Sequence, residues 1–227
     1  MRGLQKAISW VSAVVLLTEP CAWAENPETK KITEADKAVV SNFLAGQRAK
    51  VLQTTAIMNL RQIGLALFEF ETEYGSFPDE KTAVLVKEAT GTKAELKAKT
   101  ANDCFYQLIA AQILQTDSLF SLDSPKQGEE NTKLPEQIKK CAFSYLSGQN
   151  SAGNPSRPVV VGPLVNGKTT FNPAMLGGKA VILRVDNSVQ SFPIDKEGRV
   201  MIDGRDLFDP AQPFWDGKVP PVVWPAE

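Results

Sequence analysis

Residues 56–74 read AIMNLRQIGLALFEFETEY, and this stretch defines the helix on which we expect the rest of the chain to fold. Its apolar residues recur at steps of four and three, which places them on one face of an α-helix. The residues of this face are Ala56, Leu60, Ile63, Leu67, Phe70 and Tyr74. No proline interrupts the helical pattern back to a capping-box-like start at Thr33. One helix over residues 33–74 is therefore predicted, with Gly75 as its C-cap.

The first half of this helix carries fewer apolar residues than the second. They are Val40, Phe43, Leu44 and Val51, with Arg48, Lys50 and Gln53 between them. We therefore expect the second half to be buried in a domain and the first half to project or to pack loosely. Gly46 and Gly64 argue against a straight rod, because each costs up to about 1 kcal/mol relative to alanine.

Shorter elements follow the long helix. Residues 79–89 form a second helix candidate, and Asn102 is predicted to cap a third, which buries Phe105 and Leu108. From residue 141 the period changes: Phe143 and Tyr145 alternate with Ala142 and Ser144, and short apolar runs follow. Strands are expected near 143–145, 159–161, 179–185 and 189–194. This order predicts an α+β fold, in which the long N-terminal helix packs on a small antiparallel sheet. The irregular tail from residue 203 is expected to wrap the surface through aromatic anchors, which are Phe208, Phe214, Trp215 and Trp224.

The first 24 residues resemble a secretory signal peptide. Arg2 and Lys6 precede an apolar run at residues 7–17, and Ala22-Trp23-Ala24 forms an A-x-A site. Cleavage before Glu25 would leave a polar linker at 25–32 and a single domain at 33–227, without a stable transmembrane segment. A buried first helix is the alternative interpretation. Export predicts a location in the periplasm, the outer envelope or the medium.

The composition excludes several function classes. The chain has 227 residues, a formal net charge of −1 and no histidine. Near-neutral charge gives no electrostatic basis for binding nucleic acid. Without histidine, the chain lacks the commonest general base, the Ser-His and Cys-His pairs and the usual zinc ligands. No catalytic residue, metal site or cofactor is predicted.

Signal cleavage would remove Cys21 and leave two cysteines, Cys104 and Cys141. An even pair in an exported chain predicts a disulfide between them. Two buried free thiols remain the alternative, because sequence cannot show that the side chains meet.

Residues 162–169 read GPLVNGKT and match the P-loop pattern G-x-x-x-x-G-K-[ST]. A P-loop needs a helix after it, whereas the residues that follow are β-branched, aromatic and then Pro173. Asn166-Gly167 is a strong hairpin signal. We therefore interpret the segment as a turn between strands and predict no nucleotide. The run AVILRVD at residues 180–186 resembles a magnesium-binding strand, but Asp186-Asn187-Ser188 reads equally as a turn.

Five acidic residues lie close together near the C-terminus: Asp195, Glu197, Asp203, Asp206 and Asp209. Alternating oxygens suit calcium, but the EF-hand pattern is absent from the sequence. Turn formation and solvation are the favoured interpretation.

Residues 59–67 read NLRQIGLAL, and residues 74–78 read YGSFP. Together they resemble the pilin-like proteins of type II secretion and type IV pili, in particular the pseudopilin-type proteins of planctomycetes and verrucomicrobia. The strand, turn and strand AVILRVDNSV at residues 180–189 is loosely similar to a later motif of the same family. The resemblance implies a non-enzymatic subunit of an envelope fibre or secretion apparatus, with other such subunits as partners.

The sequence departs from this family in one respect. Classical members have a basic leader, a G-F-T-L-I-E-like cleavage motif and then an apolar helix that anchors the subunit. No such motif precedes the helix here, and residues 33–55 are too polar for a membrane helix. The chain thus looks like a pilin-type head exported by an ordinary signal peptide.

Three function hypotheses follow. The leading one is a non-catalytic extracytoplasmic protein that acts by protein–protein contact. Its candidate surfaces are Val40, Phe43, Leu44 and Val51 on the helix and Trp215 and Trp224 in the tail, although ordinary packing would explain both sets equally well. The second is a glycan- or ligand-binding module that uses Phe214, Trp215 and Trp224. An exported enzyme is third, disfavoured by the missing histidine.

Overall fold

The computed structural model describes residues 34–122 and 134–226, and the structural statements below refer to that part of the chain. The predicted signal peptide and linker lie outside it, as does Thr33. The helices are α1 (Glu34–Tyr74), α2 (Glu80–Thr90), α3 (Ala101–Ala110) and the short 3-10 helix η1 (Ser118–Phe120). The strands are β1 (Ser144–Leu146), β2 (Pro158–Gly162), β3 (Lys179–Arg184), β4 (Val189–Pro193), β5 (Met201–Ile202), β6 (Arg205–Asp206) and β7 (Val222–Val223).

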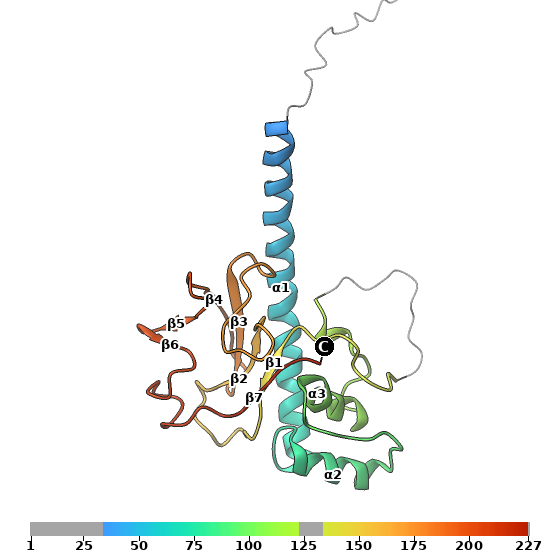
Figure 1. Ribbon diagram of the computed structural model, residues 1–227. Coiled ribbons are helices and arrows are strands. Elements are labelled where there is room, and N and C mark those ends of the chain that lie inside the picture. Colours follow the sequence, from blue (N-terminus) through green and yellow to red (C-terminus); the bar gives the residue numbers. More distant parts are fainter. Residues whose placement is uncertain (1–33, 123–133, 227) are drawn as a thin grey trace, which may run out of the picture.

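The predicted α+β class is confirmed. α1 is one rod of 41 residues, about 60 Å long at 1.5 Å per residue. Five antiparallel strands form a sheet in the order β4-β3-β2-β1-β7, and β5 and β6 form a separate two-stranded ribbon. The sheet lies along the second half of α1, with α2 and α3 near its C-terminal end, while the first half stands clear of the other elements (Figure 1).

Both faces of the sheet are buried, which gives the described chain three layers. Along β3, Val181 and Leu183 join the core beneath α1, whereas Ala180 and Ile182 join a second core on the opposite face. Side chains of a strand point alternately to its two sides, so a strand covered on both faces reads as a continuous apolar run. β3 with its sequence KAVILR is such a strand.

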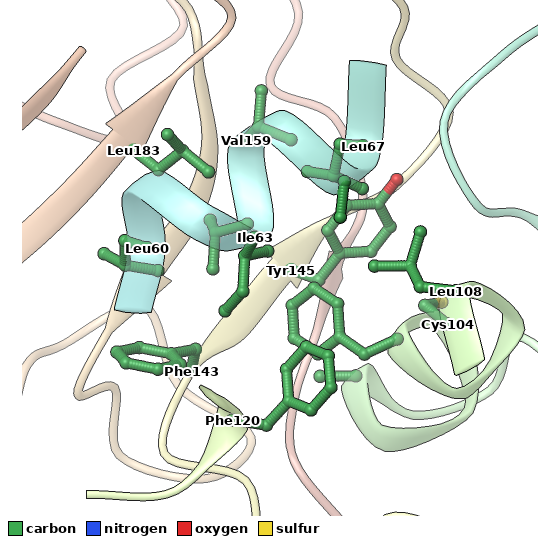
Figure 2. Close-up of a cluster of buried hydrophobic side chains, with 14 of the residues drawn as sticks. Leu60, Ile63, Leu67, Cys104, Leu108, Phe120, Phe143, Tyr145, Val159 and Leu183 are labelled. Carbon is green, nitrogen blue, oxygen red and sulfur yellow. The ribbon is translucent and has the colours of Figure 1, made fainter. Parts of the chain in front are cut away.

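The first core joins α1, α3, η1 and the sheet, as Figure 2 shows. Leu60, Ile63 and Leu67 enter it from α1 and are almost fully buried. The ring of Phe105 stacks on Phe120 with 4.8 Å between centroids, and meets Tyr145 edge-on at 5.5 Å. The predicted buried face of residues 56–74 is therefore the face that holds this core together.

The second core is built by the C-terminal tail. Leu207, Phe214 and Trp215 pack with Val161 and Ile182 of the sheet. At the far edge of the sheet, β7 pairs antiparallel with β1. The tail was expected to wrap the surface, but instead it covers one face of the sheet and extends its edge.

The ends of the helices follow local capping chemistry. Asp79 accepts hydrogen bonds from the backbone N–H groups of Lys81 and Thr82 at the start of α2. The predicted cap of α3 at Asn102 is wrong, because Thr100 closes a capping box with Asp103. The Asn102 side chain instead donates to the carbonyl of Ile138 and accepts from the N–H of Ala226.

Gly64 lets the β3–β4 turn approach α1 closely. A Cβ atom at this position would overlap the side-chain oxygen of Asn187 and lie 3.0 Å from Cδ1 of Leu183. Asn187 has φ of 62°, and its buried Oδ1 accepts no hydrogen bond from the described residues. The glycine of the NLRQIGLAL stretch and the DNS turn thus form one contact, so the helix cannot accept a larger residue here without displacing the hairpin.

Replacing Gly64 with alanine should destabilise the fold by about 1–3 kcal/mol, because overpacking against the hairpin exceeds the gain in helix propensity of up to about 1 kcal/mol. Gly46→Ala is the matched control in the same helix, since nothing lies within 4 Å of its Cβ position, and it should be neutral or stabilising. Urea unfolding of both variants measures the difference.

Adding Asn187→Gly to Gly64→Ala should recover part of the loss, because glycine tolerates a positive φ and removes the overlapping oxygen. If Gly64→Ala were as stable as Gly46→Ala, the close approach of hairpin and helix would be refuted.

Candidate interaction surface

The first half of α1 is exposed on every side. All side chains from Asp36 to Arg48 are exposed, including Phe43 at 63% and Leu44 at 59%. Val39, Val40 and Val51 are also more than half exposed. The structure therefore places Val40, Phe43, Leu44 and Val51, the helix residues selected from the sequence, on the surface.

This exposure contrasts with residues 53–74 of α1, which are tied to the rest of the fold. Gln53 donates to the hydroxyl of Ser191 at 2.6 Å, and Asn59 donates to the carbonyl of Ser121 at 3.3 Å. Near the C-terminal end, Glu71 accepts from the backbone N–H of Ser151 at 2.8 Å. A helix segment without such support is marginal in water even when its sequence favours helix. A contiguous apolar surface on such a segment is typical of a binding site.

An apolar groove of about 590 Å³ lies at the base of the exposed half, between α1 and the segment that precedes β3. Its lining residues are Ala45, Arg48, Ala49, Val51, Leu52, Leu122, Ala174 and Met175. Arg48 supplies the only charge in this lining. Apolar surface thus continues from the exposed helix into a hollow beside it.

Two further apolar residues of α1 point to solvent, although they alternate with residues that were predicted to be buried. Met58 is 61% exposed and Leu65 is 55% exposed, although both lie in the half of the helix that packs on the sheet. Sequence reasoning overlooked them because it followed only the apolar face with steps of four and three. The signal that could have found them is that both continue the seven-residue spacing that begins with Leu44 and Val51.

The tail aromatics do not form an accessible surface as a group. Trp215 is 1% exposed, and its indole N–H donates to the carbonyl of Leu207 at 2.6 Å. Phe214 is buried beside it. Trp224 is half-buried and donates to the carbonyl of Lys168 at 2.9 Å. The predictions that Trp215 offers a contact surface, and that Phe214 and Trp215 stack on a ligand, are therefore wrong, because both rings fill the second core.

The predicted disulfide between Cys104 and Cys141 is not formed in this structure, in which both are free thiols. Cys104 lies in the first core, and Sγ of Cys141 donates to the carbonyl of Phe143 at 3.2 Å. Burial raises the pKa of each thiol to about 12. Such thiols are protonated at neutral pH and do not act as nucleophiles.

The GPLVNGKT segment is a turn, as interpreted from its sequence. Leu164 pairs with Phe171 across it, and the N–H of Lys168 donates to the carbonyl of Val165 at 3.0 Å. Gly167 supplies a positive φ of 70°. No helix follows in this described segment, so the helix N-terminus that would hold a phosphate is missing.

The C-terminal acidic residues serve as turn acceptors. Asp195 accepts from the backbone N–H groups of Glu197 and Arg199, and pairs with the Arg199 guanidinium at 3.1 Å. Asp206 and Asp209 each accept from the N–H group two residues later, at 2.8 Å. Backbone and guanidinium donors hold the Asp195 carboxylate and lower its pKa. Among the described residues, no three acidic or cysteine side chains converge as metal ligands.

A polar hollow of about 670 Å³ lies beside the N-terminal end of α3. Tyr106 and Glu136 line it with Asp103 and two lysines. Burial, together with the charge of Glu136, raises the pKa of Tyr106. The Asp103 carboxylate accepts the capping hydrogen bond of α3. Asp103 thus serves the helix end, and a tyrosine with a raised pKa remains protonated at neutral pH.

Comparisons with family models, with curated proteins and with solved structures find no match to this chain. Within residues 34–122 and 134–226, no helix combines the length and the apolarity that crossing a membrane requires.

In the folded chain, Cys104 and Cys141 should react with a thiol reagent at pH 8 at least about a hundredfold more slowly than in the urea-unfolded chain, because reaction needs the thiolate and the pKa of each thiol is near 12. Alkylation and peptide mass spectrometry without a reductant measure this rate. Both peptides should become alkylated after unfolding. A linked Cys104–Cys141 peptide would contradict the free-thiol state.

Proposed function

We propose that this chain is a non-catalytic, pilin-like extracytoplasmic protein that acts through protein–protein contacts in a cell-envelope fibre or secretion assembly. The observation that carries the proposal is the first half of α1, which projects from the packed part of the fold with its apolar side chains in water (Figure 1). Leaving large apolar side chains exposed is costly, and a partner that covers them recovers about 25 cal/mol per Å².

The resemblance of the NLRQIGLAL and YGSFP stretches to pilin-like proteins supports the same proposal. A long N-terminal helix packed on an antiparallel sheet is the architecture that this resemblance implies, and the described chain has that architecture. In the proposal, residues 1–24 direct export and are removed, and the second half of α1 holds the head together. The first half of α1 then presents the contact surface to other envelope subunits.

A non-catalytic role agrees with the chemistry of the described residues. Cys104 is buried, Cys141 is half-buried, and both thiols are protonated at neutral pH. Asp195, Asp206 and Asp209 accept hydrogen bonds within their own turns. The ligand-binding alternative loses its main support, because Phe214 and Trp215 are core residues.

Replacing Phe43 and Leu44 together by serine should weaken association and leave the fold intact, because both side chains are already exposed. We expect a melting temperature within about 2 °C of the parent, since surface substitutions change stability by at most about 0.5 kcal/mol. In fractionated producing cells, the parent should sediment with an envelope assembly and begin at Glu25, whereas the variant should shift to the soluble fraction.

Ile63→Ser is the control for a structural effect, because Ile63 is fully buried, and it should lower the melting temperature strongly. The proposal fails if the parent occurs only as a free soluble protein. It also fails if the Phe43 and Leu44 variant sediments like the parent.

A further inference from the structure

Five exposed apolar residues form a straight line along α1, which we call the ridge. They are Val40, Leu44, Val51, Met58 and Leu65, exposed by 55–64%. After the first step of four, they recur every seven residues. Positions seven apart drift by only about 20° around an α-helix, so the ridge stays within a sector of roughly 60°. It lies on the side of α1 opposite the buried face that contains Leu60 and Ile63.

We propose that the ridge pairs α1 with α1 of a second copy of this chain in an antiparallel arrangement. The inference rests on the proposed function and names the first partner of its contact surface. A spacing of seven is the repeat by which two helices keep one seam in contact. From Leu44 to Leu65 the ridge runs about 31 Å, which matches the contact length of a helix pair rather than an isolated pocket.

The shape of the ridge favours a helix over a membrane surface. Polar residues flank it closely on both sides, with Arg48, Thr55 and Gln62 on one side and Gln47, Thr54 and Arg61 on the other. A helix that lies in a lipid interface needs a broad apolar face. The exposed Phe43 and Val39 widen the apolar surface at the N-terminal end of the ridge, but from Val51 to Leu65 the ridge is one residue wide. A surface of that width fits instead into the groove between side chains of a facing helix.

The charges select the antiparallel orientation. In a parallel pair in register, Glu69, which continues the line of the ridge after Leu65, would face Glu69 of the second copy, and like charges repel. An antiparallel pair centred between Thr54 and Thr55 places Leu44 opposite Leu65, Val51 opposite Met58 and Val40 opposite Glu69, so four of the five ridge residues meet an apolar partner.

In that register, like charges no longer face one another across the seam. The flanking Arg48 comes next to Gln62 of the second copy, and Arg61 comes next to its Gln47. Glu73 comes to the level of Lys37. In this register, opposite charges lie next to each other at the ends of the pair, and amide groups lie next to guanidinium groups along its sides. Both kinds of contact are favourable.

The pair would cover the surface that the fold leaves open. The projecting half of each α1 would lie along the outer side of the packed half of the other, where Met58 and Leu65 are exposed. Each of the five side chains presents on the order of 100 Å², so two copies bury about 1,000 Å², the lower size of a specific interface. This size predicts a reversible dimer rather than a permanent one.

The test is sedimentation equilibrium of the chain as its producing cells process it, between about 1 and 100 µM. The parent should dimerise in this range. Val51→Glu and Met58→Lys should each raise the dimer dissociation constant at least about tenfold, because each buries a charge in the apolar seam. Val39→Glu is the matched control, since Val39 is 68% exposed on the same helix but off the ridge, and it should dimerise like the parent.

The double variant V51E/M58K tests the orientation. In the antiparallel pair each new glutamate faces a lysine of the other copy, so the dissociation constant should return to within about threefold of the parent. Circular dichroism and thermal melting should show all variants folded.

A parent that stays monomeric at 100 µM overturns the inference, as does a Val51→Glu variant that dimerises normally. A double variant weaker than either single variant overturns the antiparallel orientation. A monomeric parent that still sediments with an envelope assembly would refute the second copy as partner and leave the proposed function standing. A parent that dimerises but is absent from the envelope fraction would refute the proposed function and leave the second copy standing as the partner.

Discussion

The packing of the second half of α1 on β3 is the interaction on which the rest of the described structure depends. Leu60, Ile63 and Leu67 bury their side chains between the sheet and α3, and each contributes on the order of 1.5–3 kcal/mol. Gly64 sets how closely the β3–β4 hairpin can approach, because the Asn187 side chain occupies the place of a Cβ atom. Because α1 covers only the first face of the sheet, the apolar side chains of the second face must be buried by another segment. The C-terminal tail packs on that face.

The same packing divides α1 into a half that is packed against the sheet and α3 and a half that projects into solvent. The sheet and α3 are too short to follow a helix of 41 residues along its whole length. Helical structure therefore continues past the region where tertiary contacts support it, into a segment whose apolar side chains face water. In an isolated molecule, such a segment adds nothing to the stability of the fold. The proposed contact function and the proposed antiparallel pairing both assign a use to this unsupported half.

Much of this fold could be predicted from the sequence, because the strongest elements have clear periodicity. Steps of four and three predicted the buried face of α1, and short continuous apolar runs predicted the main strands β2 and β3. The cap of α3 was mispredicted because Thr100 and Asn102 are both good capping residues, and only the contacts of Asn102 with Ile138 and Ala226 distinguish them. Those partners lie 36 and 124 residues away in the chain, beyond the reach of local patterns.

The candidate surface was partly predictable for the same reason. Sparse apolar residues between charges correctly indicated that Val40, Phe43, Leu44 and Val51 are exposed. Trp215 was assigned to the surface because its tail has no periodicity, although the continuous apolar run of β3 indicated that a second face of the sheet must be covered. Whether Cys104 and Cys141 meet depends on how α3 and the segment before β1 pack, which spacing alone does not specify.

Hydrogen exchange along α1 at low protein concentration tests the central claim most directly. We predict that amides of residues 56–72 exchange only through global unfolding, whereas amides of residues 38–44 exchange at least about a hundredfold faster, because tertiary packing on α1 begins only near Ala49. Uniform protection along the whole helix in dilute solution would contradict the division of α1 into a packed half and an unsupported half.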